Sequence, residues 1–159
     1  MGQTQNKEFQ NKVCVITGGA GSIGLESAKL MYEAGAHIML VDQNSDNLEI
    51  AHSNFKDHDR ITICEADVSK STETQNYISK TISKWGKIDI LFANAGFSGT
   101  SAPITSYPDD IFDKVMAVNV RGPFLACKYA LPEMNDNGSI IITSSIMGVT
   151  ARPGSIAYI

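Results

Sequence analysis

The sequence has few of the residues that mark proteins held together by disulfides or metals. Its three cysteines, Cys14, Cys64 and Cys127, lie far apart and without a C-x-x-C pair, which argues against a disulfide framework or a zinc site. The three histidines show no ligand spacing with one another or with the cysteines. We therefore expect reduced thiols, as in a cytoplasmic protein, and no bound metal.

Long apolar runs and runs of positive charge are also missing. No apolar stretch approaches the roughly 20 residues that span a bilayer, and the polar N-terminus lacks the apolar stretch of a secretory signal. Lysines and arginines are scattered along a chain of net charge −4, so neither a membrane nor a nucleic acid is an expected partner. We expect a flexible polar tail over residues 1–10 and one globular domain over residues 11–159.

Short apolar runs alternate with stretches of helical period along this domain. The runs are apolar throughout, which is typical of strands buried on both faces of a parallel sheet. The expected strands are residues 13–17, 37–42, 61–66, 88–93 and 139–144, and the expected helices are 22–35, 45–56, 71–85 and 109–134. This alternation predicts an α/β fold: a doubly wound, Rossmann-like parallel sheet between two layers of helices.

A glycine-rich turn connects the first expected strand to its helix. Gly19, Gly21 and Gly24 match G-x-G-x-x-G in the strand–turn–helix context that a dinucleotide-binding turn requires. Glycines there permit a tight turn and the close approach of a pyrophosphate, which the helix N-terminus attracts. An NTPase phosphate loop is excluded because no Gly-Lys-Ser/Thr follows. A purely structural turn is the alternative. The expected cofactor contacts come from Gly18, Gly21, Ser22, Ile23 and Gly24.

The second expected strand ends in an acidic residue, Asp42, about 20 residues beyond the glycine turn. A carboxylate at this point can accept hydrogen bonds from the ribose hydroxyls of an adenosine, and it repels the 2′-phosphate of NADP. Neither the turn nor Gln43 supplies a positive charge to offset that repulsion. The sequence therefore favours NAD as cofactor. The alternative is that Asp42 is a solvated strand end.

With these motifs the sequence resembles the classical short-chain dehydrogenase/reductase family over residues 12–158. The family's glycine motif, T-G-x-x-x-G-x-G, begins at Thr17, and Ser22 replaces its middle glycine. The resemblance implies that Asp67 and Val68, after the third strand, contact adenine. It also implies that the segment Asn94-Ala95-Gly96, after the fourth strand, borders the cofactor and supports the sheet.

The same resemblance implies a catalytic set for hydride transfer between an alcohol or ketone and a nicotinamide, which needs a proton donor or acceptor at the substrate oxygen. Tyr158 follows Ser145 by 13 residues, the family's separation, so Ser145 would bind the substrate oxygen and Tyr158 would exchange its proton. Asn119 completes the family's set. Pro123 lacks an N–H, so the carbonyl of Asn119 loses its helical partner and is free to hold a water in a proton relay. The alternative for Asn119 is a packing role at a kink.

The family places a lysine four residues after its tyrosine, where it lowers a pKa that is ordinarily about 10. Here that position would be 162, after the last residue, Ile159. We therefore expect a chain with only the first five strands of the family's sheet, ending in an exposed apolar edge strand and having little or no dehydrogenase activity.

Two other functions remain open at this point. The first is a dinucleotide-binding module without catalysis, which would share the glycine turn and Asp42 but not need the lysine. The second is a flavin enzyme that uses the literal G-x-G-x-x-G, which the Ser145–Tyr158 pair disfavours. The substrate would be a small alcohol or ketone of unspecified identity. Full-length members of the family are usually homo-oligomers that associate through the long helix at residues 109–134, which leaves assembly of this chain open.

Overall fold

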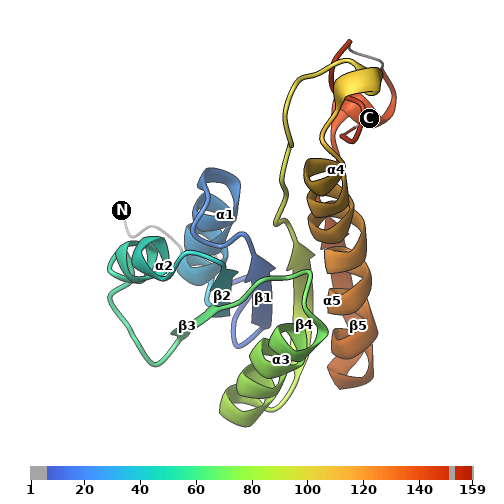
Figure 1. The fold of residues 1–159 in the computed structure, drawn as a ribbon. Coiled ribbons are helices and arrows are strands. Elements are labelled where there is room, and N and C mark those ends of the chain that lie inside the picture. Colours follow the sequence, from blue (N-terminus) through green and yellow to red (C-terminus); the bar gives the residue numbers. More distant parts are fainter. Residues whose placement is uncertain (1–6, 151–152, 159) are drawn as a thin grey trace.

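The computed structural model describes residues 7–150 and 153–158 and shows one parallel sheet with strand order β3-β2-β1-β4-β5 (Figure 1). The strands are β1 (Val13–Thr17), β2 (His37–Asp42), β3 (Ile61–Glu65), β4 (Ile88–Ala93) and β5 (Met134–Ile142). The helices are α1 (Ser22–Glu33), α2 (Ser45–His52), α3 (Ser71–Trp85), α4 (Asp109–Met116) and α5 (Gly122–Ala130). In the part of the chain that the structure describes, no helix is both long and apolar enough to cross a bilayer.

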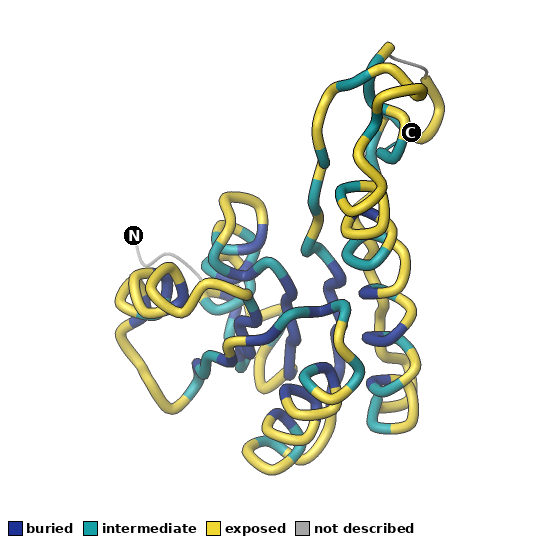
Figure 2. Tube along the Cα trace, in the orientation of Figure 1, coloured by how far each residue is buried: buried dark blue, intermediate teal, exposed yellow. Residues whose placement is uncertain are grey.

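Two apolar cores lie on opposite faces of the sheet. On one face Ile16 and Leu40 pack with Ala28 of α1 and Leu48 of α2. On the other face Val15 and Met39 belong to a cluster with residues of α3 and α5, among them Tyr77. Successive residues of β1 therefore bury their side chains on alternate faces, and Figure 2 shows the central strands dark throughout. The predicted doubly wound, three-layer α/β/α fold is confirmed.

Helix and strand ends differ from the prediction where local hydrogen bonds intervene. α1 ends at Glu33 because Gly35 takes a left-handed φ of 102°, and α2 ends at His52 because the Asn54 amide bonds to the carbonyls of Ile50 and Ala51. Near the N-terminus, Phe9 packs against the α1 side of the core, and its N–H donates to the Ala34 carbonyl. Residues 1–6 of the expected tail lie outside the described residues.

The long helix predicted at residues 109–134 is interrupted. α4 ends at Met116, a π-helical turn covers Ala117–Arg121, and α5 begins at Gly122, whose N–H reaches back five residues to the Ala117 carbonyl. Pro123 in the first turn of α5 has no N–H to continue the regular ladder, which accounts for the wider turn. A short 3₁₀ turn, Leu131–Glu133, then leads into β5.

The fifth strand begins earlier and ends earlier than the predicted 139–144. Met134 pairs with Ile88 and Ser139 pairs with Ile90, so residues 135–138 form a bulge in which Asn137 has a φ of 64°. The strand is the sheet's outer edge, and Ile142 is 53% exposed at its end. The described chain thus has the exposed apolar edge that the sequence predicts.

A buried carboxylate ties the N-terminal ends of the two central strands together. Asp89 accepts hydrogen bonds from the Val13 N–H (2.9 Å), the Lys12 ammonium (3.0 Å) and the Asn135 amide (3.0 Å). Burial alone would raise the pKa of Asp89, but these three hydrogen bonds together lower it below its usual value. The ionised carboxylate therefore links β1, β4 and the bulge of β5.

We predict that Asp89→Asn lowers the free energy of unfolding by about 1–3 kcal/mol, because charged hydrogen bonds at a buried site are lost. Since the folded-state pKa is lowered, the stabilisation is present above the unfolded value of about 3.9 and is lost as pH falls through the folded value. Urea unfolding at pH 7 and at pH 3 measures both effects. Asp136→Asn, an exposed neighbour, is the matched control, and equal losses in the two variants would contradict the prediction.

Candidate active site

The glycine turn between β1 and α1 has the shape that a phosphate-binding turn requires. Gly18 takes a left-handed φ of 64°, and a Cβ there would lie 2.9 Å from the Ala95 Cα. A Cβ on Gly24 would overlap the Gly18 carbonyl, so this glycine packs α1 against the turn. Gly21 is the N-cap residue of α1 and provides no side-chain cap. The N–H groups of Ser22 and Ile23, in the first turn, therefore have no partner within the helix.

Asp42 lies directly against this turn. Its Oδ2 accepts a hydrogen bond from the Ala20 N–H at 3.2 Å, and its Oδ1 accepts one from the Asn44 N–H at 3.3 Å. Each carboxylate oxygen has a further lone pair, so two hydroxyl donors can still be accommodated. The structure therefore brings together the carboxylate and the glycine turn on which the dinucleotide hypothesis depends.

A small cavity of about 110 Å³ adjoins Asp42 and is lined by Asp67, Val68 and Gly96. Burial alone would raise the pKa of Asp67, but hydrogen bonds from the hydroxyl and N–H of Ser69, with the nearby Lys70, lower it. The carboxylate is thus ionised at neutral pH and can accept a hydrogen bond from an amino group. The size and lining of this cavity fit a purine base beside an apolar wall.

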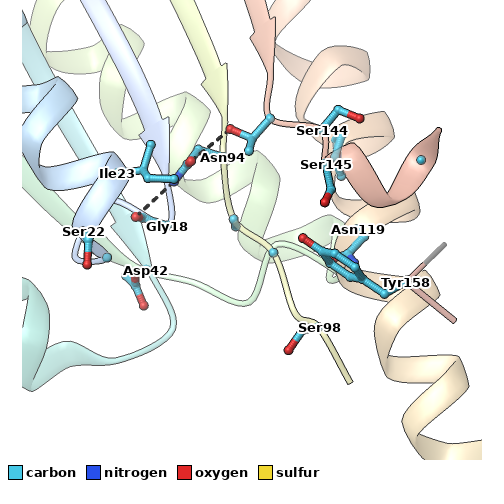
Figure 3. A pocket seen from close by; sticks show the side chains of 16 residues that line it. Gly18, Ser22, Ile23, Asp42, Asn94, Ser98, Asn119, Ser144, Ser145 and Tyr158 are labelled. Carbon is cyan, nitrogen blue, oxygen red and sulfur yellow. Dashed lines mark hydrogen bonds between the residues drawn. The ribbon is translucent and has the colours of Figure 1, made fainter. Parts of the chain in front are cut away.

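A hydrogen-bond network joins the ends of β1, β4 and β5. The Thr17 hydroxyl accepts hydrogen bonds from the N–H groups of Asn94 (3.0 Å) and Ala95 (3.1 Å). The Asn94 amide donates to the Thr17 and Gly18 carbonyls, and its oxygen accepts from the Thr143 hydroxyl at 3.0 Å. Asn94 therefore holds the glycine turn in place, as the dashed line between Asn94 and Gly18 in Figure 3 shows.

A larger cavity, of about 630 Å³, extends from the glycine turn to the C-terminal part of the chain. Figure 3 shows Gly18, Ser22 and Asp42 on one side of it, and Ser145 and Tyr158 on the other. Three segments far apart in the sequence thus meet at the carboxyl ends of the strands, where ligands bind in open α/β sheets. Thr143, Ser144 and Ser98 add further hydroxyl groups to its wall.

The two expected proton-handling residues both lie on short turns. Ser145 follows β5, and its hydroxyl oxygen accepts a hydrogen bond from the Met147 N–H at 3.2 Å. Tyr158 belongs to a turn in which its N–H donates to the Ser155 carbonyl at 3.1 Å. Tyr158 therefore lies outside any helix.

Asn119 lies in the π-helical turn, and its side chain makes two hydrogen bonds to the backbone of Phe97. Its amide oxygen accepts from the Phe97 N–H at 2.8 Å, and its amide nitrogen donates to the Phe97 carbonyl at 2.9 Å. The pair of bonds fixes the chain just after β4 and sets the wall of the larger cavity. The side chain therefore positions the backbone, a contact that sequence reasoning did not find.

Of the predicted site residues, only Gly24 lines neither cavity. Sequence reasoning also missed several residues that do line them. Lys114 of α4 is the one cation among the described lining residues; it faces the smaller cavity, with its ammonium 4.8 Å from the Phe97 ring centre. Nothing in the spacing of α4 marks this lysine, because its place depends on how the helix packs over the strand ends.

A family model described as short chain dehydrogenase matches residues 12–159. The chain is 39% identical to Short chain aldehyde dehydrogenase 1 of Euphorbia lathyris, over 97% of this chain and 54% of that protein. It is 34% identical to the levodione reductase of Leifsonia aquatica, over 94% of this chain and 58% of that protein. The chain therefore spans little more than half the length of these curated relatives.

Solved structures agree with the sequence comparison. NAD⁺-bound xylitol dehydrogenase superposes with a TM-score of 0.89 and 35% identity, over 96% of this chain and 60% of that one. The 3-ketoacyl-(acyl-carrier-protein) reductase from Brucella melitensis complexed with NADH gives 0.88 and 28%, over 94% and 64%. The glycine turn, the cavity beside it and these matches together identify the chain as a member of the short-chain dehydrogenase family.

Proposed function

We propose that this chain is the cofactor-binding part of an NAD-dependent oxidoreductase that acts on an alcohol or a ketone. The observation that carries the proposal is the single cavity that joins the glycine turn and Asp42 to Ser145 and Tyr158. A nicotinamide dinucleotide fits the turn, because Gly21, Ser22 and Ile23 line the cavity where the first N–H groups of α1 have no helical partner. The NAD⁺-bound and NADH-bound relatives support the choice of cofactor class.

In this proposal the cofactor's adenosine occupies the Asp42 end of the site. Asp42 would accept hydrogen bonds from the ribose hydroxyls, Asp67 and Val68 would hold the adenine, and the Ser22 and Ile23 N–H groups would donate to the pyrophosphate. Gly21, Ala95 and Gly96 line the larger cavity with small side chains or none, which would let the cofactor approach the backbone there. Gly18 and Gly24 hold the turn together, because a Cβ on either would come too close to neighbouring backbone.

The reaction takes place at the other end of the cavity. NAD, when bound, accepts the hydride from an alcohol or, in its reduced form, returns it to a ketone. Ser145 donates a hydrogen bond to the substrate oxygen, and Tyr158 takes or supplies its proton. Asn119 holds the Phe97 backbone, while its own carbonyl is the group that we expect to bind a relay water.

A dinucleotide-binding module without catalysis is the second candidate function. It is favoured by the position of Tyr158 on a turn, where its N–H donates to the Ser155 carbonyl. Both candidates require NADH binding, so binding tests the site and turnover separates the two.

We predict that Asp42→Ala weakens NADH binding by about 10- to 100-fold, since two hydrogen bonds to a charged acceptor are lost. NADPH binding should change little or improve, because the carboxylate no longer repels the 2′-phosphate. Fluorescence titration of the chain with each cofactor measures both constants. Asp46→Ala, an exposed carboxylate in the first turn of α2, is the control. An Asp42 variant that binds NADH as the parent does would exclude the assigned ribose contact.

An exposed apolar stripe along α4 and α5 supports self-association. Its members repeat at helical spacing and are between 38% and 61% exposed: Phe112, Met116, Val120, Phe124 and Leu131. We propose that this stripe packs against a second copy of the chain, as the resemblance to the family implies.

We predict that Phe124→Asp shifts the chain towards monomers, raising the dissociation constant by at least about tenfold, because a charge would be buried in the interface. Sedimentation velocity over a concentration series measures the change. Ile50→Asp, on the outer face of α2 and 66% exposed, is the matched control and should leave association unaltered. A parent chain that is monomeric at all concentrations would refute the stripe's role.

A further inference from the structure

The fold brings two of the three histidines together at the end of α2. His52 is the last residue of the helix, and His58 lies in the loop that leads to β3. The Nδ1 atom of His58 is 3.2 Å from the Nε2 atom of His52, and the ring centres are 4.6 Å apart. His58 is exposed and His52 half-buried, so the pair is open to solvent. The sequence spacing predicted no such pair.

The backbone on both sides of His58 is anchored. Phe55 is buried and meets the Tyr32 ring edge to face, with centroids 5.0 Å apart. The Asp57 N–H donates to the Tyr32 hydroxyl at 2.7 Å, and the Asp57 carboxylate pairs with Arg60 at 3.0 Å. The loop therefore presents His58 to His52 from a fixed frame, which reduces the ordering entropy that a ligand bridging the two rings would have to overcome.

The separation of the two ring nitrogens matches that of two ligands on one metal ion. Nitrogens about 2.0–2.1 Å from a tetrahedral zinc ion lie about 3.3–3.4 Å from each other. Glu49 precedes His52 by three residues on α2, so its carboxylate projects from the same side of the helix. A Glu-x-x-His pair with this spacing supplies metal ligands in helical carboxylate proteins.

We propose that His52 and His58 form a binding site for a divalent transition-metal ion such as Zn²⁺ or Ni²⁺, with Glu49 as the third ligand after side-chain rotation. Among the described residues no group of three or more His, Cys, Asp or Glu is already arranged around a metal position, so the site begins with the two imidazoles. Imidazole ligands select borderline metals of this class over Mg²⁺ and Ca²⁺, which prefer oxygen.

The site is separate from the proposed active site, because none of its three residues lines either cavity there. In Figure 1 the loop between α2 and β3 lies at the far side of the sheet from β5. A metal bound to both histidines would join the loop to the helix in the folded chain only. It would therefore raise the thermal midpoint of unfolding in proportion to its preference for the folded state.

The test is a thermal unfolding and calorimetric titration of the untagged chain with Ni²⁺ and Zn²⁺, with Mg²⁺ as the negative control. We expect saturable binding of one ion and a rise of the midpoint, with His52→Gln and His58→Gln each weakening binding by at least about tenfold. Glu49→Gln should weaken it less. His37→Gln, which alters the third histidine, should retain the full response.

Two results would overturn the proposal: no midpoint shift at millimolar Ni²⁺ or Zn²⁺, or a shift that persists unchanged in His58→Gln. Because His58 is exposed, its substitution leaves the fold intact, and a lost response cannot be attributed to unfolding. NADH binding plays no part in this outcome, so the result is independent of the proposed oxidoreductase function.

Discussion

A polypeptide of residues 1–159 is expected to bind NADH and yet to reduce ketones or oxidise alcohols about 10²- to 10⁴-fold more slowly than full-length relatives. Tyr158 is the expected proton donor and acceptor, and a phenol becomes an effective base only where a nearby cation favours its ionised form. The sequence has no lysine after Lys128 that could favour the ionised form. The turn at Ser155 and Tyr158 also supplies less support than a helix would.

The measurement combines binding and turnover on one sample. Fluorescence titration with NADH establishes that the chain is folded and competent to bind, and a spectrophotometric assay with a panel of polyols, secondary alcohols and ketones then measures turnover. The full-length xylitol dehydrogenase, assayed on xylitol, is the positive control. A turnover number within tenfold of that control on any substrate of the panel would refute the prediction. It would also show that the cavity around Ser145 and Tyr158 is sufficient for proton transfer.

The strands β1, β2 and β4 could be predicted from the sequence because a single local property determines them. Each is a short apolar run that is buried on both faces. Each ends where a glycine or a polar residue follows: Gly18 after β1, Gln43 after β2 and Asn94 after β4. The glycine turn could be predicted for a similar reason, since only glycine adopts the left-handed conformation of Gly18 without cost. The position of Asp42 against that turn then follows from the pairing of β1 with β2.

The missed features all depend on contacts between distant segments. The bulge of β5 forms where Asn135 reaches the buried Asp89, and the π-helical turn brings Asn119 to the Phe97 backbone. The sequence predicts the lost helical hydrogen bond at Asn119 but neither the π-helical turn nor the bulge, because both depend on these contacts. The Thr17–Asn94 bonds are likewise not predictable from spacing, since only the assembled sheet brings these groups close. The approach of His58 to His52 depends on a loop conformation that the contact of Asp57 with Tyr32 fixes.

The second prediction with a large expected effect concerns Gly18. Gly18→Ala should lower the free energy of unfolding by about 2–4 kcal/mol, from left-handed strain of about 1–2 kcal/mol and a comparable overpacking cost. A Cβ there would meet the Ala95 Cα at 2.9 Å and the Asn94 amide nitrogen at 3.1 Å. Asn94 holds the turn by donating to the Thr17 and Gly18 carbonyls, so a Cβ that crowds the Asn94 amide must shift the turn. NADH binding should therefore weaken by at least about tenfold.

Gly86→Ala separates strain from contact in the same experiment. Gly86 also has a left-handed φ, of 89°, but a Cβ there would meet nothing within 4 Å. Its substitution should therefore cost only the backbone strain, about 1–3 kcal/mol, and leave NADH binding unchanged. Urea unfolding and NADH titration of both variants give the comparison. Equal losses of stability with normal binding in both would mean that the turn does not depend on its contact with Ala95, and the assignment of the phosphate site would then fail.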